Sequence, residues 1–125
     1  MTVGIPKILK PDIASTVETK NVLFDFGALL ASDYAAGTII SSIVEINVTV
    51  APGSAAQDPT PQSRMIGSAI IVTSEYNSIA NGAVVAWFGT MIGNVTYLLQ
   101  CVVALSDGIS QPTIEVKLQC YNPNA

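Results

Sequence analysis

Residues that commonly carry enzyme chemistry are scarce in this chain of 125 residues. It contains no histidine, two cysteines and nine aspartates and glutamates. The absence of histidine removes the commonest general base at neutral pH and every histidine-based triad or metal site. Cys101 and Cys120 have no visible group that would lower a thiol pKa, and no glycine-rich phosphate loop precedes a helix. The sequence therefore predicts a protein that is not an enzyme and has no cofactor.

Calcium binding is the one metal chemistry for which the chain offers candidate ligands. Asp58, Asn77 and Asp107 carry suitable oxygen atoms, but the chain lacks the dense run of aspartates that calcium loops use. The dipeptides Asp58-Pro59 and Asp107-Gly108 are also typical turn formers. We therefore expect turns at these positions and no metal site.

The aromatic residues suggest binding surfaces of two kinds. Tyr34, Tyr76 and Tyr121 fall on expected loops or outward strand positions, whereas Trp87 lies in a run in which either face can be buried. Tyrosine and tryptophan anchor protein interfaces and also stack on sugars. Scattered tyrosines favour interface anchoring. A carbohydrate- or host-surface-binding module requires Tyr34, Tyr76 and Trp87 together at an open groove.

Charge is unusually sparse in this chain. Only 11% of the residues are charged, against about 25% in an average soluble domain. Because interface cores are depleted in charge, this composition indicates a subunit of an assembly. The alternative is a surface solvated by serine, threonine, asparagine and glutamine. The net charge of −4 and the sequence pI near 4.4 argue against nucleic acid or an anionic membrane as a partner.

The sequence shows no sign of a membrane span or of export. The uncharged stretch from Tyr76 to Ser106 is interrupted by asparagines and glycines, so it does not match a spanning helix of roughly 20 apolar residues. No basic region followed by an apolar run opens the chain, which predicts synthesis and persistence in a cytoplasm. There, buried thiols are favoured over a disulfide between Cys101 and Cys120.

Alternating apolar and polar residues predict strands separated by turns. The clearest run is Thr38–Val50, with Ile40, Val44, Ile46, Val48 and Val50 expected on one face. A short helical turn is expected at Gly27–Ala31. The other predicted strands cover Val22–Phe26, Met65–Ser74, Ala83–Phe88, Val95–Leu105 and Thr113–Tyr121.

Turn residues predict how the strands connect. Asn81-Gly82 is the typical sequence of a two-residue type I′ turn, which would join Ile70–Ile79 to Ala83–Phe88 as a hairpin. Alternation in the last two strands suggests a hairpin in which Cys101 lies opposite Cys120. The proline-rich segment Ala51–Arg64 is expected to be irregular, either a surface crossover between sheets or a contact loop.

About seven short strands without a long amphipathic helix predict an all-β fold, an immunoglobulin-like antiparallel β-sandwich in residues 21–125. Residues 1–20 carry two prolines and no sustained periodicity, so we expect an extended N-terminal arm that lies on a neighbouring subunit. Tyr97, just after a Gly-Asn turn, is either a tyrosine corner of such a fold or an ordinary half-buried aromatic residue.

Several segments, in their order along the chain, resemble small tailed-bacteriophage virion proteins known as fibre–tail adaptor or immunoglobulin-like structural proteins. The most specific part is the stretch from Gly89 to Gly108, which contains Gly-Asn-Val-Thr-Tyr followed by alternating residues and Ser-Asp-Gly. The other segments are Phe24-Asp-Phe-Gly-Ala-Leu-Leu, Gly37-Thr-Ile-Ile-Ser-Ser and Asp58-Pro-Thr-Pro-Gln-Ser. Phe26 stands where the family usually has tryptophan, and Thr90-Met91 replaces a Gly-Gly turn.

The resemblance implies a virion protein without enzymatic activity, made in the host cytoplasm, that joins tail fibres to the tail or portal region. A capsid decoration protein is the alternative within the same class. The implied partners are fibre, tail, portal or capsid proteins and further copies of the chain. No binding residues carry over from the family. The contact residues that we expect lie in the arm, the proline-rich loop and the outward tyrosines: Ile5, Ile8, Leu9, Ile13, Tyr34, Asp58, Pro59, Pro61, Tyr76 and Tyr121.

Overall fold

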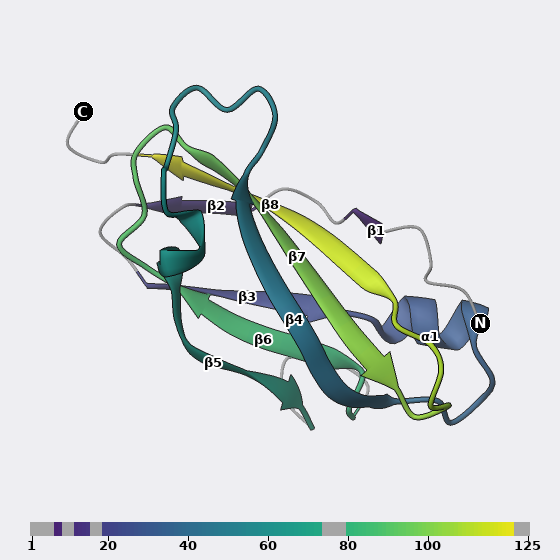
Figure 1. Cartoon of the computed structure of the whole chain (residues 1–125). Helices are drawn as coiled ribbons and strands as arrows, with labels where there is room; N and C mark the ends of the chain where they lie inside the picture. Colours follow the sequence, from purple (N-terminus) through teal and green to yellow (C-terminus); the bar gives the residue numbers. More distant parts are fainter. Residues whose placement is uncertain (1–6, 9–11, 16–18, 74–79, 122–125) are drawn as a thin grey trace.

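Two β-sheets packed face to face make up most of the protein, which confirms the predicted all-β, sandwich-like fold (Figure 1). The computed structural model describes residues 7–8, 12–15, 19–73 and 80–121. Within these residues there are eight strands, one short α-helix and one 3₁₀ turn. No helix in the described part of the chain is long and apolar enough to cross a membrane.

The first sheet is built around three long antiparallel strands. β4 (Ile40–Val50) pairs with β7 (Thr96–Leu105), and β7 pairs with β8 (Thr113–Tyr121). Two short strands, β1 (Lys7–Ile8) and β2 (Asp12–Ser15), add to the other edge of β8 in the parallel direction.

Part of the predicted N-terminal arm therefore lies on its own sheet. β1 and β2 both fall within residues 1–20, and each contacts β8 of the same chain. The expectation that the arm binds a neighbouring subunit stays a prediction, as does the boundary at residue 20.

The second sheet has three antiparallel strands in the order β3, β6, β5. β3 (Lys20–Asp25) and β5 (Met65–Val72) flank β6 (Ala83–Phe88). The predicted helical turn is confirmed as α1 (Gly27–Asp33), which follows β3 directly. The 3₁₀ turn η1 (Pro61–Arg64) precedes β5.

Strict alternation along β7 and β8 places the core between the two sheets. Every second residue of β7, beginning at Tyr97, is buried, as the sequence predicts. β-branched and aromatic side chains fill this layer from both sheets because they pack well on a pleated surface. Its largest members are Tyr97, Phe24, Phe26, Phe88, Leu99, Leu105, Ile114 and Leu118.

The prediction that Val44 points inward was wrong. Register shifts occur in β4 between Ile40 and Ser42 and again between Ile43 and Glu45. Each shift adds one residue to β4 opposite β7, and Val44 is the extra residue of the second, with 46% of its surface exposed. Ile43 packs against the core instead, because a bulge reverses the alternation that precedes it.

The two-residue turn at Asn81-Gly82 was also predicted wrongly, although β5 and β6 are antiparallel neighbours as expected. Val72 pairs with Ala83, so the connection runs from Thr73 to Gly82. Asn81 does adopt a positive φ of 58°. Its amide donates to the Val72 carbonyl over 2.8 Å, and its carbonyl accepts from the Ile40 amide over 2.9 Å. Asn-Gly therefore indicated the backbone conformation correctly but not the length of the connection.

The register predicted for β7 and β8 was wrong by an even number of residues. Cys101 lies opposite Ile114, whereas the Cys120 amide donates to the Val95 carbonyl over 3.0 Å. An even shift leaves every side chain on the same face of the sheet, so alternation cannot distinguish the two registers.

The turn at Asp107-Gly108 fixes this register. The Asp107 carboxylate accepts hydrogen bonds from the amides of Ile109 (2.9 Å) and Ser110 (2.8 Å), and the Leu105 amide donates to the Ser110 carbonyl. Gly108 completes the turn with a φ of 82°. A hairpin centred on residues 107–108 excludes the pairing of Cys101 with Cys120, which requires a hairpin centred on residues 110–111.

Replacing Gly108 tests this turn. We expect Gly108→Ala to lower the free energy of unfolding by about 1 kcal/mol, because a Cβ atom disfavours the left-handed backbone. Gly108→Asn should cost less, since asparagine tolerates that conformation. Urea denaturation of both variants measures the difference. Equal losses would argue against a left-handed residue at this position.

Candidate functional site

The segment between β4 and β5, residues 51–64, which we call the crossover loop, is held by a buried cluster of charged and polar side chains. As predicted, it crosses from β4 in one sheet to β5 in the other, and most of it is irregular. Asp58, from the middle of this loop, is only 5% exposed. It meets Arg64 from η1 and Tyr97 from the start of β7.

The Asp58 carboxylate receives hydrogen bonds on both oxygens. Arg64 donates from Nε to Oδ2 over 2.8 Å and from Nη2 to Oδ1 over 3.2 Å, which is the two-pronged geometry of a strong ion pair. The Tyr97 hydroxyl donates to Oδ2 over 2.7 Å, and the Thr60 amide donates to Oδ1 over 2.9 Å. The buried charge is thus paired and solvated by protein groups.

These contacts fix the protonation states of the cluster. The hydrogen bonds from Arg64, assisted by those from Tyr97 and Thr60, outweigh burial and lower the pKa of Asp58 from 3.8 to about 2. Burial is the main cause that raises the pKa of Tyr97 to about 12. Neither group changes charge near neutral pH, so the cluster suits a structural role and not proton transfer.

The cluster also holds the turn that precedes β7. Arg64 donates from Nη1 to the Thr90 carbonyl over 2.7 Å, and Thr90 has a φ of 54°, which a β-branched residue rarely adopts. The Ile92 amide donates to the Tyr97 hydroxyl over 3.1 Å. Arg64 and Tyr97 therefore join the crossover loop and the turn at residues 89–95 into one fixed unit.

Gln62 fastens the same segment to the edge of β4. Its side-chain carbonyl accepts from the Val48 amide over 2.9 Å, and its side-chain nitrogen donates to the Ile46 carbonyl over 3.0 Å. This amide pairs with β4 as the backbone of an added strand would. It therefore satisfies part of an edge that is otherwise open.

The fixed loop presents uncharged residues to solvent. Asp58, expected as a contact residue, has its carboxylate inside the protein, whereas Pro59 is exposed and Pro61 is half-buried. The exposed residues of the loop are Pro52, Gly53, Ala55, Gln57, Pro59, Thr60, Gln62 and Ser63.

The other expected contact residues do not gather in one place. Tyr34 follows α1 and packs half-buried against the core; burial, followed by Asp33 and Asp107, raises its pKa. Tyr121 is exposed at the end of β8.

The expected arm contacts can be placed only in part. Ile8 lies in β1 and Ile13 lies in β2, but their side chains are not among the described features. Ile5, Leu9 and Tyr76 lie outside the described residues.

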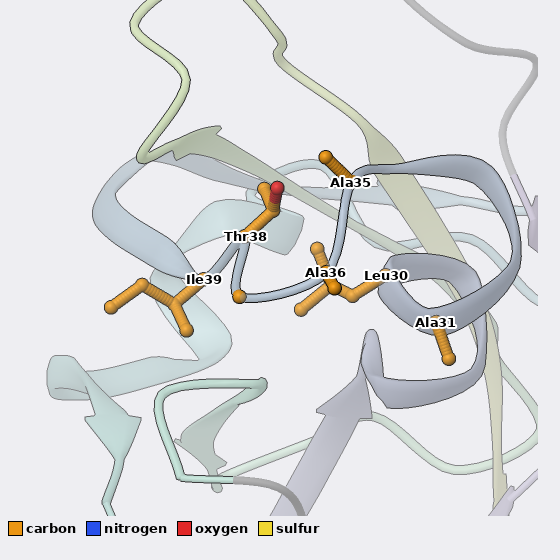
Figure 2. Close-up of a pocket in the computed structure, with 7 residues that line it drawn as sticks. Leu30, Ala31, Ala35, Ala36, Thr38 and Ile39 are labelled. Atoms are coloured by element: carbon orange, nitrogen blue, oxygen red, sulfur yellow. The ribbon is translucent and has the colours of Figure 1, made fainter.

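A shallow apolar pocket lies beside α1, at the end of the sandwich opposite the crossover loop (Figures 1 and 2). Its volume is about 390 Å³, and Thr38 is the only lining residue with a polar side chain. The remaining lining residues are Leu30, Ala31, Ala35, Ala36, Gly37 and Ile39. The pocket lacks the convergent polar groups that orient a substrate.

The outer face of the second sheet is mostly apolar, although Asn21 and Asp25 of β3 also lie on it, and it was not among the predicted surfaces. Trp87 and Val85 on β6 face the same way as Leu23 on β3 and Ile66 and Ile70 on β5. The signal was present in Ala83–Phe88, a run with no polar residue on either face. Trp87 belongs to this face and Tyr34 packs in the main core, so these two aromatics form no common platform.

The two cysteines do not form a disulfide, and Cys101 and Cys120 are both buried. Burial raises the pKa of Cys101 to about 12. Cys120 Sγ lies 3.5 Å from Met91 Sδ inside the core. Across the described residues, no three histidine, cysteine, aspartate or glutamate side chains are close enough to hold a metal ion.

Removal of the Tyr97 hydroxyl tests the buried cluster. We expect Tyr97→Phe to lower the free energy of unfolding by about 1–3 kcal/mol, because the Ile92 amide loses its acceptor and Asp58 loses a donor. Tyr121→Phe, at an exposed position, is the matched control and should change stability by less than about 0.5 kcal/mol. Urea denaturation compares the two. Similar small effects would contradict a structural role for the hydroxyl.

Acid should weaken the fold through Asp58. Because its pKa is lowered in the folded state, its contribution is present above pH 3.8 and is lost as the pH falls toward 2. The shift corresponds to about 2 kcal/mol. We expect the carboxyl carbon of Asp58 to titrate near pH 2 by NMR, with unfolding free energy falling over the same range. A midpoint at the ordinary aspartate value would refute the ion pair.

No protein-family model matches the chain. No curated protein and no solved structure matches it either.

Proposed function

We propose that this chain is a structural subunit of a tailed-bacteriophage virion, an adaptor that joins receptor-binding fibres to the tail or portal region. The observation that carries this proposal is the crossover loop, whose exposed residues are uncharged and whose backbone is fixed by Asp58, Arg64 and Tyr97. A loop that is ordered before binding loses less conformational entropy when a partner covers it. Such a surface suits a lasting contact within an assembly.

The strand order supports an immunoglobulin-like sandwich as the finer description of the fold. In constant-type immunoglobulin domains, strands A, B, E and D form one sheet and strands C, F and G form the other. Here β3, β6 and β5 take the places of B, E and D, and β4, β7 and β8 take those of C, F and G. β1 and β2 then take the place of a first strand that has joined β8.

Tyr97 adds to this assignment. In such folds a tyrosine near the start of strand F bonds through its hydroxyl to backbone a few residues upstream. Tyr97 lies near the start of β7 and bonds to the amide of Ile92. Leu99 stands where antibody domains place the second cysteine of their disulfide, so the core here relies on apolar packing alone at that point.

Two of the segments that carry the resemblance to fibre–tail adaptors meet in the buried cluster. Asp58 begins Asp-Pro-Thr-Pro-Gln-Ser, and Tyr97 belongs to the stretch from Gly89 to Gly108. The Tyr97 hydroxyl donates to Asp58 over 2.7 Å, so the two segments are joined by a buried hydrogen bond. They hold the loop that we assign to contact with fibre, tail or portal proteins.

A charged substitution in the loop tests its role in assembly. Gln57 is exposed there, and Gln111 is exposed in the turn at the other end of the molecule. We expect Gln57→Arg to fold normally but to lower incorporation into particles about tenfold or more, since a buried unpaired charge weakens an interface. Gln111→Arg should be incorporated normally. Equal incorporation of both variants would remove the loop from the interface.

A cryo-electron density map of particles from the phage that encodes this chain tests the virion role itself. We expect density for the sandwich between the fibres and the tail or portal, with the crossover loop against a neighbour. Density on the icosahedral shell would assign the chain as a capsid decoration protein instead. Absence of the chain from purified particles would overturn the proposal.

A further inference from the structure

Thr90 is an exposed residue held in a backbone conformation that its side chain disfavours. Its φ is 54°, in the left-handed region. A Cβ atom makes this region unfavourable for any residue other than glycine, and a branched Cβ makes it rarer still. Strain of this kind persists only where the surrounding structure imposes it, and it is concentrated at functional sites.

The other left-handed positions in the described part of the chain carry residues that suit them. Each is an asparagine or a glycine, and these two residues adopt the conformation at little cost. They are Asn81, Asn94, Gly37, Gly53, Gly67 and Gly108. Thr90 is therefore the exception in a chain that otherwise relaxes such positions, which indicates that its side chain serves another purpose.

The interior of the protein does not account for that purpose. Arg64 donates to the Thr90 carbonyl over 2.7 Å, but this is a backbone contact that any residue at position 90 can accept. Within the described residues, the Thr90 side chain forms no hydrogen bond, and it is exposed to solvent. The hydroxyl and the methyl group are thus left for a contact outside the chain.

Thr90 lies beside the crossover loop. The Arg64 guanidinium that bonds to the Thr90 carbonyl also donates from Nη2 to Thr60 Oγ1 over 3.3 Å. The Gly89 amide donates to the Arg64 carbonyl over 2.9 Å. A Cβ atom on Gly89 would lie 2.5 Å from Ile66 Cδ1, so the chain that leads to Thr90 is closely packed. Two exposed threonines, one from the loop and one from the turn, are therefore held by the same guanidinium.

We propose that Thr90 contacts the same partner that covers the crossover loop, so that the interface extends onto the turn at residues 89–95. The partner is a neighbouring virion protein with an uncharged polar surface, which bonds to the Thr90 hydroxyl and packs on its methyl group. A threonine with a fixed backbone and a restricted χ1 loses little conformational freedom on binding. This inference rests on the proposed function.

Replacement of Thr90 by asparagine separates a contact from a structural role. Because asparagine relaxes the left-handed backbone, Thr90→Asn should raise the midpoint of thermal unfolding by about 3 °C or more. It should nevertheless lower incorporation into particles about fivefold or more, since an interface contact is lost. Quantitative mass spectrometry of particles assembled with equal amounts of variant and wild type measures this ratio. A purely structural residue cannot combine higher stability with poorer assembly.

Asn81→Gly is the matched control. It exchanges two residues that suit a left-handed backbone, at a position that bonds to the start of β4, away from the crossover loop. This variant should be incorporated as the wild type is. If Thr90→Asn fails to fold, Thr90→Gly takes its place in the incorporation measurement.

Two results would overturn the inference. One is incorporation of Thr90→Asn at the wild-type level. The other is an unchanged unfolding midpoint, because threonine would then cause no strain at this position. If Gln57→Arg is excluded from particles while Thr90→Asn is not, the proposed function stands and this inference alone fails. If the wild-type chain is absent from particles, the proposed function fails and takes the inference with it.

Discussion

The ion pair between Asp58 and Arg64 is the contact that fixes the crossover loop and the turn before β7. Arg64 joins the crossover loop to the turn that precedes β7, and the buried Tyr97 links Asp58 to the core through its hydroxyl. Removing Arg64 would leave the buried Asp58 carboxylate without its ion-pair partner, which costs about 3–5 kcal/mol. A loop without regular structure thereby becomes a rigid surface, and its exposed side chains need no charge to hold their positions.

The edges of the two sheets complete this picture of an assembly subunit. Short strands, bulges and the Gln62 amide protect the edges of the first sheet. The second sheet is treated differently, because β5 combines exposed isoleucines with an absence of charge. The exposed residues of the crossover loop are uncharged as well, and this loop is the surface to which we assign partners.

Local patterns in the sequence predicted most strands, the short helix and the inward face of β7. They failed where the outcome depended on connection length. Alternation cannot detect an even shift between β7 and β8, and it does not reveal the bulge that turns Val44 outward. The cluster was beyond prediction for a related reason. Asp58 and Tyr97 are distant in the sequence, and nothing near Asp58 indicated that its carboxylate would be buried beside Arg64.

Amide hydrogen exchange tests most directly whether the buried cluster fixes the loop. The Thr60 amide donates to Asp58, and the Ile92 amide donates to the Tyr97 hydroxyl. If the cluster holds both segments rigid, these two amides exchange about as slowly as amides within β7, although neither belongs to a strand. Exchange at the rate of an open loop would show that the loop moves freely, and the account of a preformed contact surface would then be wrong.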